Sequence, residues 1–306
     1  MTTAEPLPPL PANARYDELR DRANALLQAG TLPAAQGLFE EALVLARDLG
    51  EPELVDRAYC NLAAVVVETE KRATVLPELR RILMSNRDPE NCRLAAYHIA
   101  RAYELAKETK KGLFYARIAC DLSVRLGRDP WIASSHNQMG SLLLADSFFD
   151  EACRHYELAL ELMPDATEVL RALILDNLGY CRLVQGRHAE GFRNLFASLR
   201  MLRRLGTRLW EVFPHLDLCF GYLEIGRLRP AARHSMLALD LAEEVGDEQS
   251  TRNAMYLLGE TANLSGDHEG AFRQFETLQK RFFPGESYLP NFLLAVDVRR
   301  LINLKA

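Results

Sequence analysis

The sequence predicts an all-α protein built from helix pairs that repeat along the chain. Two segments within residues 136–164 place small and large apolar side chains at the i+3, i+4 and i+7 spacings of one helix face. The first face comprises His136, Met139, Gly140 and Leu143, and the second comprises Ala152, Tyr156, Ala159 and Leu160. Glycines expected in turns follow at positions 186, 226 and 266, a period of 40 residues. A single helix pair cannot bury its apolar face alone, so neighbouring pairs must stack into an α-solenoid with a shared core.

The residue order in this stretch resembles the tetratricopeptide repeat (TPR). The first helix has a large residue, then Met139 and Gly140, then another large residue. The second helix has Ala152, the aromatic Tyr156 and Ala159, and Pro164 follows it. The resemblance implies a right-handed superhelix of about seven helix-turn-helix repeats followed by a C-terminal capping helix. Repeats of this family usually have about 34 residues, so the longer period here extends the second helix. This long form resembles the repeats of bacterial peptide-sensing regulators and of animal polarity adaptors.

Three regions are expected along the chain. Residues 1–13 read as a Pro-rich disordered tail, residues 14–282 as the seven repeats, and residues 283–306 as the capping helix. A capping helix shields the last repeat of a solenoid from water, and docking onto a partner is the alternative role for this segment.

The first three repeats begin near Tyr16, Asp56 and Arg93. In the first repeat, Gly30 provides the turn and Gly50 ends the second helix. The second repeat lacks a turn glycine, so its second helix, over TVLPELRRIL, is expected to be short or tilted. The third repeat has a small-residue face in GLFYARIACDLSVRLG, which favours close helix packing.

The fourth repeat is the stretch 136–164, and the last three begin near Ala172, Val212 and Arg252. Each of these three has a turn glycine and small or aromatic residues at the packing positions. The sequence PGES then separates the repeats from YLPNFLLAVDVRRLINLKA, in which Ser287 can cap a helix. The apolar face of that helix comprises Phe292, Val296 and Leu301.

Composition excludes several classes of protein. A net charge of −5 and a pI near 5.9 argue against a dedicated nucleic-acid-binding protein. No apolar run is long enough for a transmembrane segment, and MTTAEPLPPLPANA lacks the basic and apolar regions of a signal peptide. The six cysteines form no CxxC pair, which favours buried, reduced thiols. These features predict a cytoplasmic protein.

No motif for catalysis is present. The sequence contains no GxGxxG, GxxxxGK[ST], HExxH, GxSxG or CxxC pattern. Six of the seven histidines form three sets at equivalent repeat positions, which lie too far apart along a solenoid to share one metal. These sets are His136 with His215, His155 with His234, and His188 with His268. We therefore expect a protein that is not an enzyme, with no catalytic residues, no cofactor and no metal site.

The resemblance also implies where a partner would bind. In tetratricopeptide repeats the first helices line a concave groove, and repeat positions 2, 5, 6, 9, 12 and 13 face it. Polar residues assigned to this groove are Arg20, Asn24, Asn61, Tyr97, His98, Arg101, Glu104, Asn137, Gln138, Ser141, Asp176, Asn177, Tyr256 and Glu260. Such side chains offer donors and acceptors to the backbone of an extended peptide, although a merely solvated face fits them too.

One predicted helix, LWEVFPHLDLCFGYLEIG, carries a second apolar stripe beside its packing stripe. The second stripe comprises Phe213, Leu216, Phe220 and Leu223, and Tyr180 and Leu183 extend it. An exposed apolar patch of this kind usually marks an interface, with the aromatic residues as anchors. Tighter packing within the superhelix, or coverage by the chain's own Pro-rich tail, are the alternatives.

A carboxylate clamp for a C-terminal acid is only partly matched. Arg20, Asn24 and Asn61 fit its pattern, but Leu94 and His98 stand at the two other basic positions. Without those cations a bound carboxylate loses most of its charge-assisted hydrogen bonds, and Arg101, one turn away, is the candidate substitute.

An arginine-rich region lies between Arg182 and Arg233, where ten arginines and four acidic residues give a local net charge of +6. An acidic partner surface or an anionic lipid could use this charge. A solvated outer face is the alternative.

The sequence therefore predicts a non-catalytic interaction module or adaptor that binds a peptide or helix of a partner protein in its groove. Phe213, Phe220 and Tyr180 are the expected anchors, and Asn61, Asn137, Asn177 and Arg101 the expected polar guides. Two other functions fit the same pattern. They are a peptide-sensing regulatory subunit and a homo-oligomeric scaffold.

Overall fold

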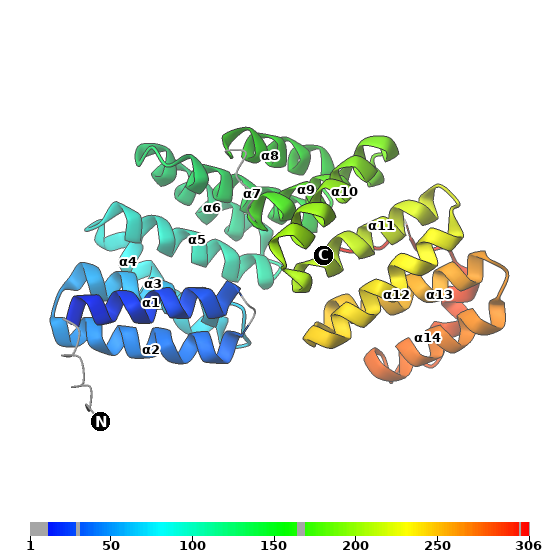
Figure 1. Cartoon of the computed structure of the whole chain (residues 1–306), viewed down its shortest axis with the longest axis horizontal. Coiled ribbons are helices and arrows are strands. Elements are labelled where there is room, and N and C mark those ends of the chain that lie inside the picture. Colours follow the sequence, from blue (N-terminus) through cyan, green and yellow to red (C-terminus); the bar gives the residue numbers. More distant parts are fainter. Residues whose placement is uncertain (1–11, 29–30, 164–168, 300, 306) are drawn as a thin grey trace, which may run out of the picture. The chain divides into compact units, whose positions relative to one another are not determined.

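The computed structural model describes residues 12–28, 31–163, 169–299 and 301–305, and all regular secondary structure in these ranges is helical (Figure 1). The expected tail over residues 1–13 lies outside the described residues up to position 11, and the first helix begins at Ala12. Gly30 and Pro164, which the repeat pattern assigned to a turn and to a repeat end, also lie outside them.

Successive helices form seven pairs, followed by one short helix, which confirms the predicted all-α solenoid. The pairs are α1 (Ala12–Gln28) with α2 (Leu32–Leu49), α3 (Pro52–Val66) with α4 (Leu76–Ser85), α5 (Pro89–Leu105) with α6 (Thr109–Arg125), α7 (Asp129–Ala145) with α8 (Phe149–Leu162), α9 (Val169–Val184) with α10 (His188–Leu205), α11 (Val212–Glu224) with α12 (Leu228–Val245), and α13 (Glu248–Leu264) with α14 (His268–Phe282). Short 3-10 turns, η1 (Arg72–Val75) and η2 (Arg208–Glu211), precede α4 and α11, and α15 (Leu289–Ala295) follows the last pair. None of the helices described is both long and apolar enough to cross a membrane.

The second repeat has the short second helix that its sequence predicts. Helix α4 contains 10 residues, whereas α2 contains 18. The turn before α4 has no glycine and is filled by η1, and Asn86 in the left-handed region ends the helix.

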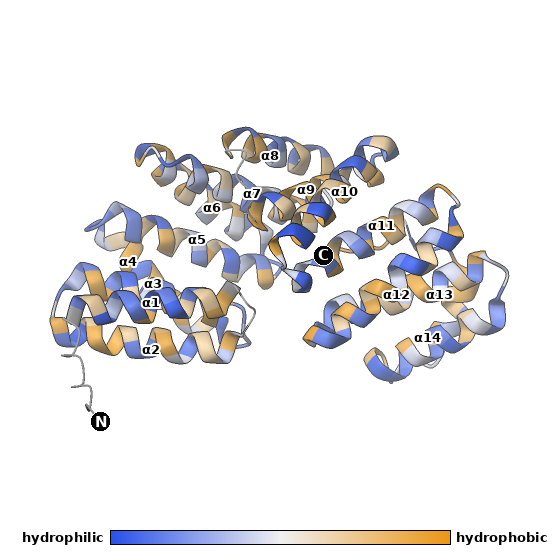
Figure 2. Ribbon diagram, viewed as in Figure 1, coloured by the Kyte–Doolittle hydropathy of each residue, from blue (hydrophilic) through white to orange (hydrophobic). Residues whose placement is uncertain are grey.

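The chain divides into two compact units, Met1–Trp131 and Ile132–Ala306, and each has its own core. Hydrophobic and hydrophilic residues are interspersed along each helix, so that one side of the helix can be buried (Figure 2). The largest fully buried side chains of the first unit are Phe39, Leu79, Ile82 and Ile99. Those of the second unit include Tyr156, Tyr180, Ile174, Leu178 and Phe275.

The turns inside the repeats share one backbone conformation. Gly186, Gly226 and Gly266 have φ angles of 77°, 68° and 87°, in the left-handed region where glycine carries no steric cost. Lys107 and Ser147, with φ of 58° and 63°, occupy the corresponding turns of the third and fourth repeats. The positive-φ turn therefore recurs every 39 or 40 residues from the third repeat to the seventh, including turns from which glycine is absent.

A glycine on the first helix of a pair lets the second helix approach closely. A Cβ atom added at Gly140 in α7 would lie 2.6 Å from Cε1 of Tyr156 in α8. The same arrangement recurs at Gly259, where a Cβ would lie 2.5 Å from Cε1 of Phe275. These contacts explain why the sequence pairs a glycine with a large residue in these repeats.

All six cysteines carry free thiols, five of them buried and Cys120 half-buried. All six lie inside helices.

The region expected to be a capping helix over residues 283–306 contains helix only from Leu289 to Ala295. Val296 adopts an extended conformation, and the described residues that follow form no helix. We call residues 296–299 and 301–305 the tail segment. It runs back along the second unit and makes hydrogen bonds and ion pairs with α9, α11 and α13 (Figure 1). These contacts give the tail segment polar partners that a continued helix would lack.

Candidate functional site

Two buried carboxylates hold one lysine of the tail segment. Nζ of Lys305 lies 2.7 Å from Oδ2 of Asp176 in α9 and 2.8 Å from Oδ2 of Asp217 in α11. Asp176 and Asp217 are each only 1% exposed. Asp176 stands on the first helix of the fifth repeat and Asp217 on that of the sixth, so the pair forms only when neighbouring repeats stack.

One ammonium group balances the charge of only one of these two carboxylates. Burial raises the pKa of Asp217 well above its usual value, an effect that Lys305 opposes and that Asp176 reinforces. Burial also raises the pKa of Asp176. Burial alone would lower the pKa of Lys305, but the two carboxylates outweigh it and raise that pKa. The lysine therefore stays charged, and Asp217 is the carboxyl group most ready to take up a proton.

Side chains of the second unit also bind the backbone of the tail segment. The Leu304 N–H donates to the hydroxyl oxygen of Tyr180 at 3.1 Å, and Nδ2 of Asn253 in α13 donates to the Leu304 carbonyl at 3.0 Å. In the other direction, Nδ2 of Asn303 donates to the carbonyl of Leu144 at 2.6 Å. Recognition of both polar groups of one residue is how a surface binds extended chain.

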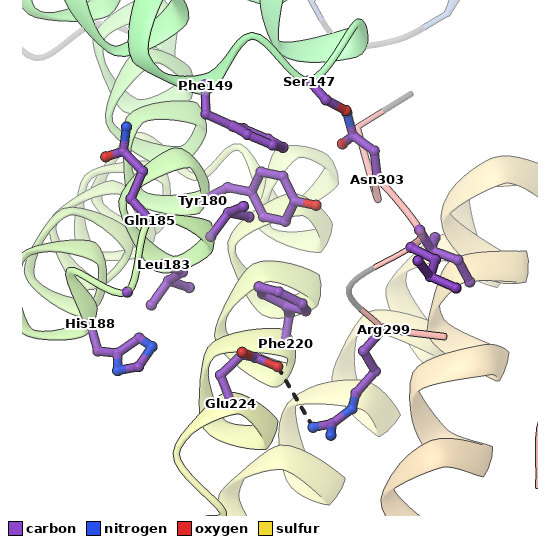
Figure 3. Close-up of a pocket in the computed structure, with 14 residues that line it drawn as sticks. Ser147, Phe149, Tyr180, Leu183, Gln185, His188, Phe220, Glu224, Arg299 and Asn303 are labelled. Carbon is purple, nitrogen blue, oxygen red and sulfur yellow. Dashed lines mark hydrogen bonds and ion pairs between the residues drawn. The ribbon is translucent and has the colours of Figure 1, made fainter. Parts of the chain in front are cut away.

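A second cation lies further along the tail segment. The guanidinium of Arg299 lies 3.4 Å from Oε1 of Glu260 in α13 and 3.7 Å from Oε1 of Glu224 at the end of α11. Figure 3 shows Arg299 directed at Glu224 from the opposite side of the pocket. Glu260 is 1% exposed, and burial raises its pKa. The shortest ion pair of Arg299, at 2.6 Å, is with Asp297 of the tail segment itself. Acidic residues of α9, α11 and α13 thus lie near both Lys305 and Arg299.

Aromatic side chains fill the space between these charged groups. The Tyr180 and Phe220 ring centroids lie 5.5 Å apart, and Nζ of Lys305 lies 5.6 Å from the centroid of Phe213. A pocket of about 570 Å³ remains between the tail segment and the helices. Figure 3 shows Tyr180, Phe220 and Phe149 lining it, with Asn303 and Arg299 on the tail side. We call the face formed by α9, α11 and α13, together with this pocket, the inner surface.

Several residues assigned to the groove from sequence lie at the inner surface. Asp176, Tyr180 and Glu260 contact the tail segment directly, and Phe213 lies beside Lys305. Of the other groove residues in the second unit, Leu183 and Phe220 line the pocket, and Leu216, Leu223 and Tyr256 are buried in the core. Ser141 accepts a hydrogen bond from Tyr156. Gln138 is buried, and Asn137 and Asn177 are half-buried.

The groove residues expected in the first unit are held by that unit's own groups. Arg101 pairs with Glu68 at 2.8 Å and with Glu104 at 2.9 Å, so its charge is already balanced. His98 is buried, and burial together with Arg93 lowers its pKa to about 3. The remaining four are Arg20, which pairs with Asp17 and Asp21, the exposed Asn24, and the half-buried Asn61 and Tyr97. A carboxylate clamp built on Arg101 would have to break two existing ion pairs.

Sequence reasoning missed Lys305, Asn303, Arg299 and Asp217. The first three were assigned to a helix, in which Arg299 and Asn303 would share one face and Lys305 would point to another side. Asp217 lies between the two apolar stripes of α11, where a carboxylate is out of place. Asp217 lies in an apolar helix, one repeat after Asp176. Because buried carboxylates need a counter-charge, these two positions were a signal that a cation from elsewhere in the chain lies beside them.

The fold matches solved structures of helical-repeat proteins. A Rap protein complexed with Competence and Sporulation Factor superimposes with a TM-score of 0.70 at 12% identity, over 94% of this chain and 79% of that chain. PilW, a type IV pilus biogenesis factor, gives 0.60 at 20% identity, over 78% and 98% of the two chains. A tetratricopeptide repeat protein from Parabacteroides merdae gives 0.53 at 16% identity, over 94% and 100%. No family model and no curated protein matches the sequence. These similarities establish the tetratricopeptide repeat fold for this chain.

Proposed function

We propose that the chain is a non-catalytic interaction module whose inner surface binds an extended segment of a partner protein. The observation that carries this proposal is the tail segment itself. A non-helical stretch of chain, in which the N–H groups of Leu301 and Ile302 donate to the Val298 carbonyl, is bound through the Leu304 backbone, through Lys305 between two buried carboxylates, and through Arg299. A surface that binds one such segment offers the same contacts to another of similar chemistry.

The tail segment then acts as an intramolecular occupant that a partner has to displace. Because it is tethered to α15, its effective concentration at the inner surface is in the millimolar range, as for short flexible linkers. A partner segment must therefore bring a cation to Asp176 and Asp217 and an apolar residue to the Tyr180 and Phe220 rings. An acidic segment would leave these two carboxylates without a counter-charge.

Competition with a synthetic peptide tests this function. A fluorescein-labelled, C-terminally amidated peptide with the sequence of residues 296–305 is titrated with the full chain, and anisotropy reports binding. We expect the Asn303→Ala/Lys305→Ala chain to bind the peptide about 10- to 100-fold more tightly than the unmodified chain, because its own tail competes less. Met84→Ala in α4 is the control, since that side chain is 81% exposed and lies outside the inner surface.

The chemistry of the peptide provides the second arm. Replacing its lysine with glutamate should abolish binding, because three carboxylates would then meet at one site. Equal binding by the unmodified chain and the Asn303→Ala/Lys305→Ala variant, or no binding by either, would contradict the proposal. A light-scattering mass above that of one chain, falling to one chain in the variant, would instead favour the homo-oligomeric scaffold.

A peptide-sensing regulatory subunit is the second candidate. It is supported by the similarity to a Rap protein complexed with Competence and Sporulation Factor and by the two states that a displaceable occupant provides. Small-angle scattering with the 296–305 peptide separates the two candidates. A sensor changes its radius of gyration on saturation with the peptide, whereas a simple adaptor keeps it.

A further inference from the structure

A second pocket, of about 470 Å³, opens between α10 and α12 and does not involve the tail segment. Its lining is basic and partly apolar, and it contains no acidic side chain. The lining residues are Arg193, Phe196, Leu199, Arg200 and Arg203 from α10, His215 from α11, and Arg233, His234 and Leu237 from α12.

Two histidines in contact line part of this pocket. Nδ1 of His215 lies 2.8 Å from Nδ1 of His234, so one ring donates and the other accepts a hydrogen bond. His215 is 1% exposed, and burial, together with His234, Arg203 and Arg233, lowers its pKa to about 3. Burial and the same two arginines lower the pKa of His234 to about 4. The rings are therefore neutral at pH 7, and they sense the positive field of both arginines.

Most of the arginines at this pocket lack an ion-pair partner among the described residues; all four are exposed to solvent, and Arg193 acts electrostatically on Glu190. Nε of Arg203 lies 3.1 Å from Oε2 of Glu211 in η2. Arg193, Arg200 and Arg233 form no ion pair with any residue in the described ranges. Like-charged guanidinium groups around one pocket repel each other, and an anion placed between them removes that repulsion.

An internal comparison shows that the fold does not require the three arginines of α10. An equivalent histidine pair, His136 and His155, lies 79 residues earlier, with its Nδ1 atoms 3.0 Å apart. At the same offset, the positions of Arg193, Arg200 and Arg203 are occupied by Phe114, Asp121 and Val124, whereas Arg233 corresponds to Arg154. Burial alone lowers the pKa of His136, with no arginine contributing. The repeat thus preserves the histidine pair and one arginine, and only the later copy has the three arginines of α10 beside the pair.

We propose that this pocket binds the phosphate group of a small organic phosphate. Arginine presents planar donors that match phosphate oxygens, and several guanidinium groups can share one dianion. The volume exceeds that of a bare phosphate ion and lies within the range of small-molecule sites. Phe196, Leu199 and Leu237 provide an apolar wall for the organic part of the ligand. Apart from His215 of α11, this site lies on second helices, and it shares no lining residue with the pocket beside the tail segment.

Ring signals of the histidines in NMR spectra test the proposal, with inorganic pyrophosphate as the probe. At constant ionic strength, the His215 and His234 signals should shift and saturate below about 1 mM pyrophosphate, while those of His136 and His155 stay in place. The double substitution Arg203→Gln/Arg233→Gln should weaken binding at least 10-fold. Arg204→Gln, an exposed arginine of α10 outside the pocket, should change it less than twofold. Unshifted His136 and His155 signals also show that each variant is folded.

A further arm separates the two sources of a phosphate group. Co-sedimentation of the chain, but not of Arg203→Gln/Arg233→Gln, with phosphatidic acid vesicles and not with phosphatidylcholine vesicles assigns the pocket to a lipid headgroup. No co-sedimentation, with pyrophosphate still bound, assigns it to a soluble phosphate. Shifts of equal size at both histidine pairs, equal weakening by Arg204→Gln, or no shift at 10 mM pyrophosphate would overturn the proposal.

Discussion

The ammonium group of Lys305 lies 2.7 Å from a carboxylate oxygen of Asp176, a residue that is 1% exposed. Asp217 approaches the same ammonium group at 2.8 Å. A buried charge persists only when it is paired, so the structure of this surface depends on a cation that the helices themselves do not supply. The predictions below for the tail segment follow from this dependence.

Removing the cation should release the tail segment. Lys305→Met leaves Asp176 and Asp217 without a counter-charge, and breaking a buried pair in this way costs about 3–5 kcal/mol. Water can reach both carboxylates once the tail leaves, so we expect local undocking while the helices stay folded. Hydrogen exchange at the Leu304 amide should accelerate by roughly 100-fold or more. Lys280→Met, at an exposed pair with Glu276, is the control and should leave that rate unchanged.

Docking of the tail segment should strengthen as pH falls. The pKa of Asp217 is raised in the docked state, and in an open, hydrated groove it would return to near 4. A raised pKa contributes stability that is complete below the open-state value and is lost as pH rises through the docked-state value. Lys305, Asp176 and Tyr180 face Asp217, and Lys305 remains charged because its own pKa is raised.

Hydrogen exchange from pH 8 to pH 5 measures this linkage after correction for intrinsic exchange rates. Protection of the Leu304 amide should rise by at most about tenfold per pH unit, since one proton is taken up. Asp217→Asn should remove most of the dependence. A pH-independent protection in the unmodified chain would show that the two aspartates do not couple to docking.

The Tyr180 hydroxyl should contribute measurably to docking. Tyr180→Phe leaves the buried Leu304 N–H without its acceptor, which costs about 1–3 kcal/mol. We therefore expect exchange at Leu304 to accelerate by roughly 5- to 100-fold. Tyr222→Phe in α11 is the control, because its hydroxyl makes no hydrogen bond with the described part of the tail segment. Equal exchange in both variants would count against the hydrogen bond.

Close helix approach at Gly140 should make even a methyl group destabilising. In Gly140→Ala the new Cβ would meet Tyr156 at 2.6 Å, and overpacking of this kind costs about 1–3 kcal/mol. Gly37→Ala is the matched control, since no atom lies within 4 Å of its added Cβ in α2. That variant should gain about 0.5–1 kcal/mol from helix propensity. Urea unfolding followed by circular dichroism measures both changes, and similar values would contradict the packing argument.

The helix pairs were predictable because their signals are local. A glycine at 140 with a tyrosine at 156, and turn glycines at 186, 226 and 266, define pairs and period without knowledge of tertiary structure. Even the short α4 follows from a missing turn glycine. The turns at Lys107 and Ser147 were harder, because both residues adopt positive φ without the residue type that normally signals it.

The tail segment was not predictable in the same way. YLPNFLLAVDVRRLINLKA has helical periodicity, and only α15 uses it. The non-helical conformation of the tail segment is stabilised by contacts with Asp176, Asp217 and Asn253. These three residues stand on different repeats, so they meet Lys305 and Leu304 only after the repeats have stacked. The histidine pairs were missed for a similar reason. Equivalent histidines were compared between repeats, whereas His215 meets His234 on the second helix of its own repeat.

One consequence concerns elasticity. The tail segment is fastened to the carbonyl of Leu144 at the end of α7, to α9, to α11 and to α13. The curvature of a solenoid follows from small rotations between neighbouring repeats. A segment bound to several successive repeats restricts these rotations and makes the solenoid stiffer. Loss of the Lys305 attachment would therefore alter the compliance of the second unit, with no helix gained or lost.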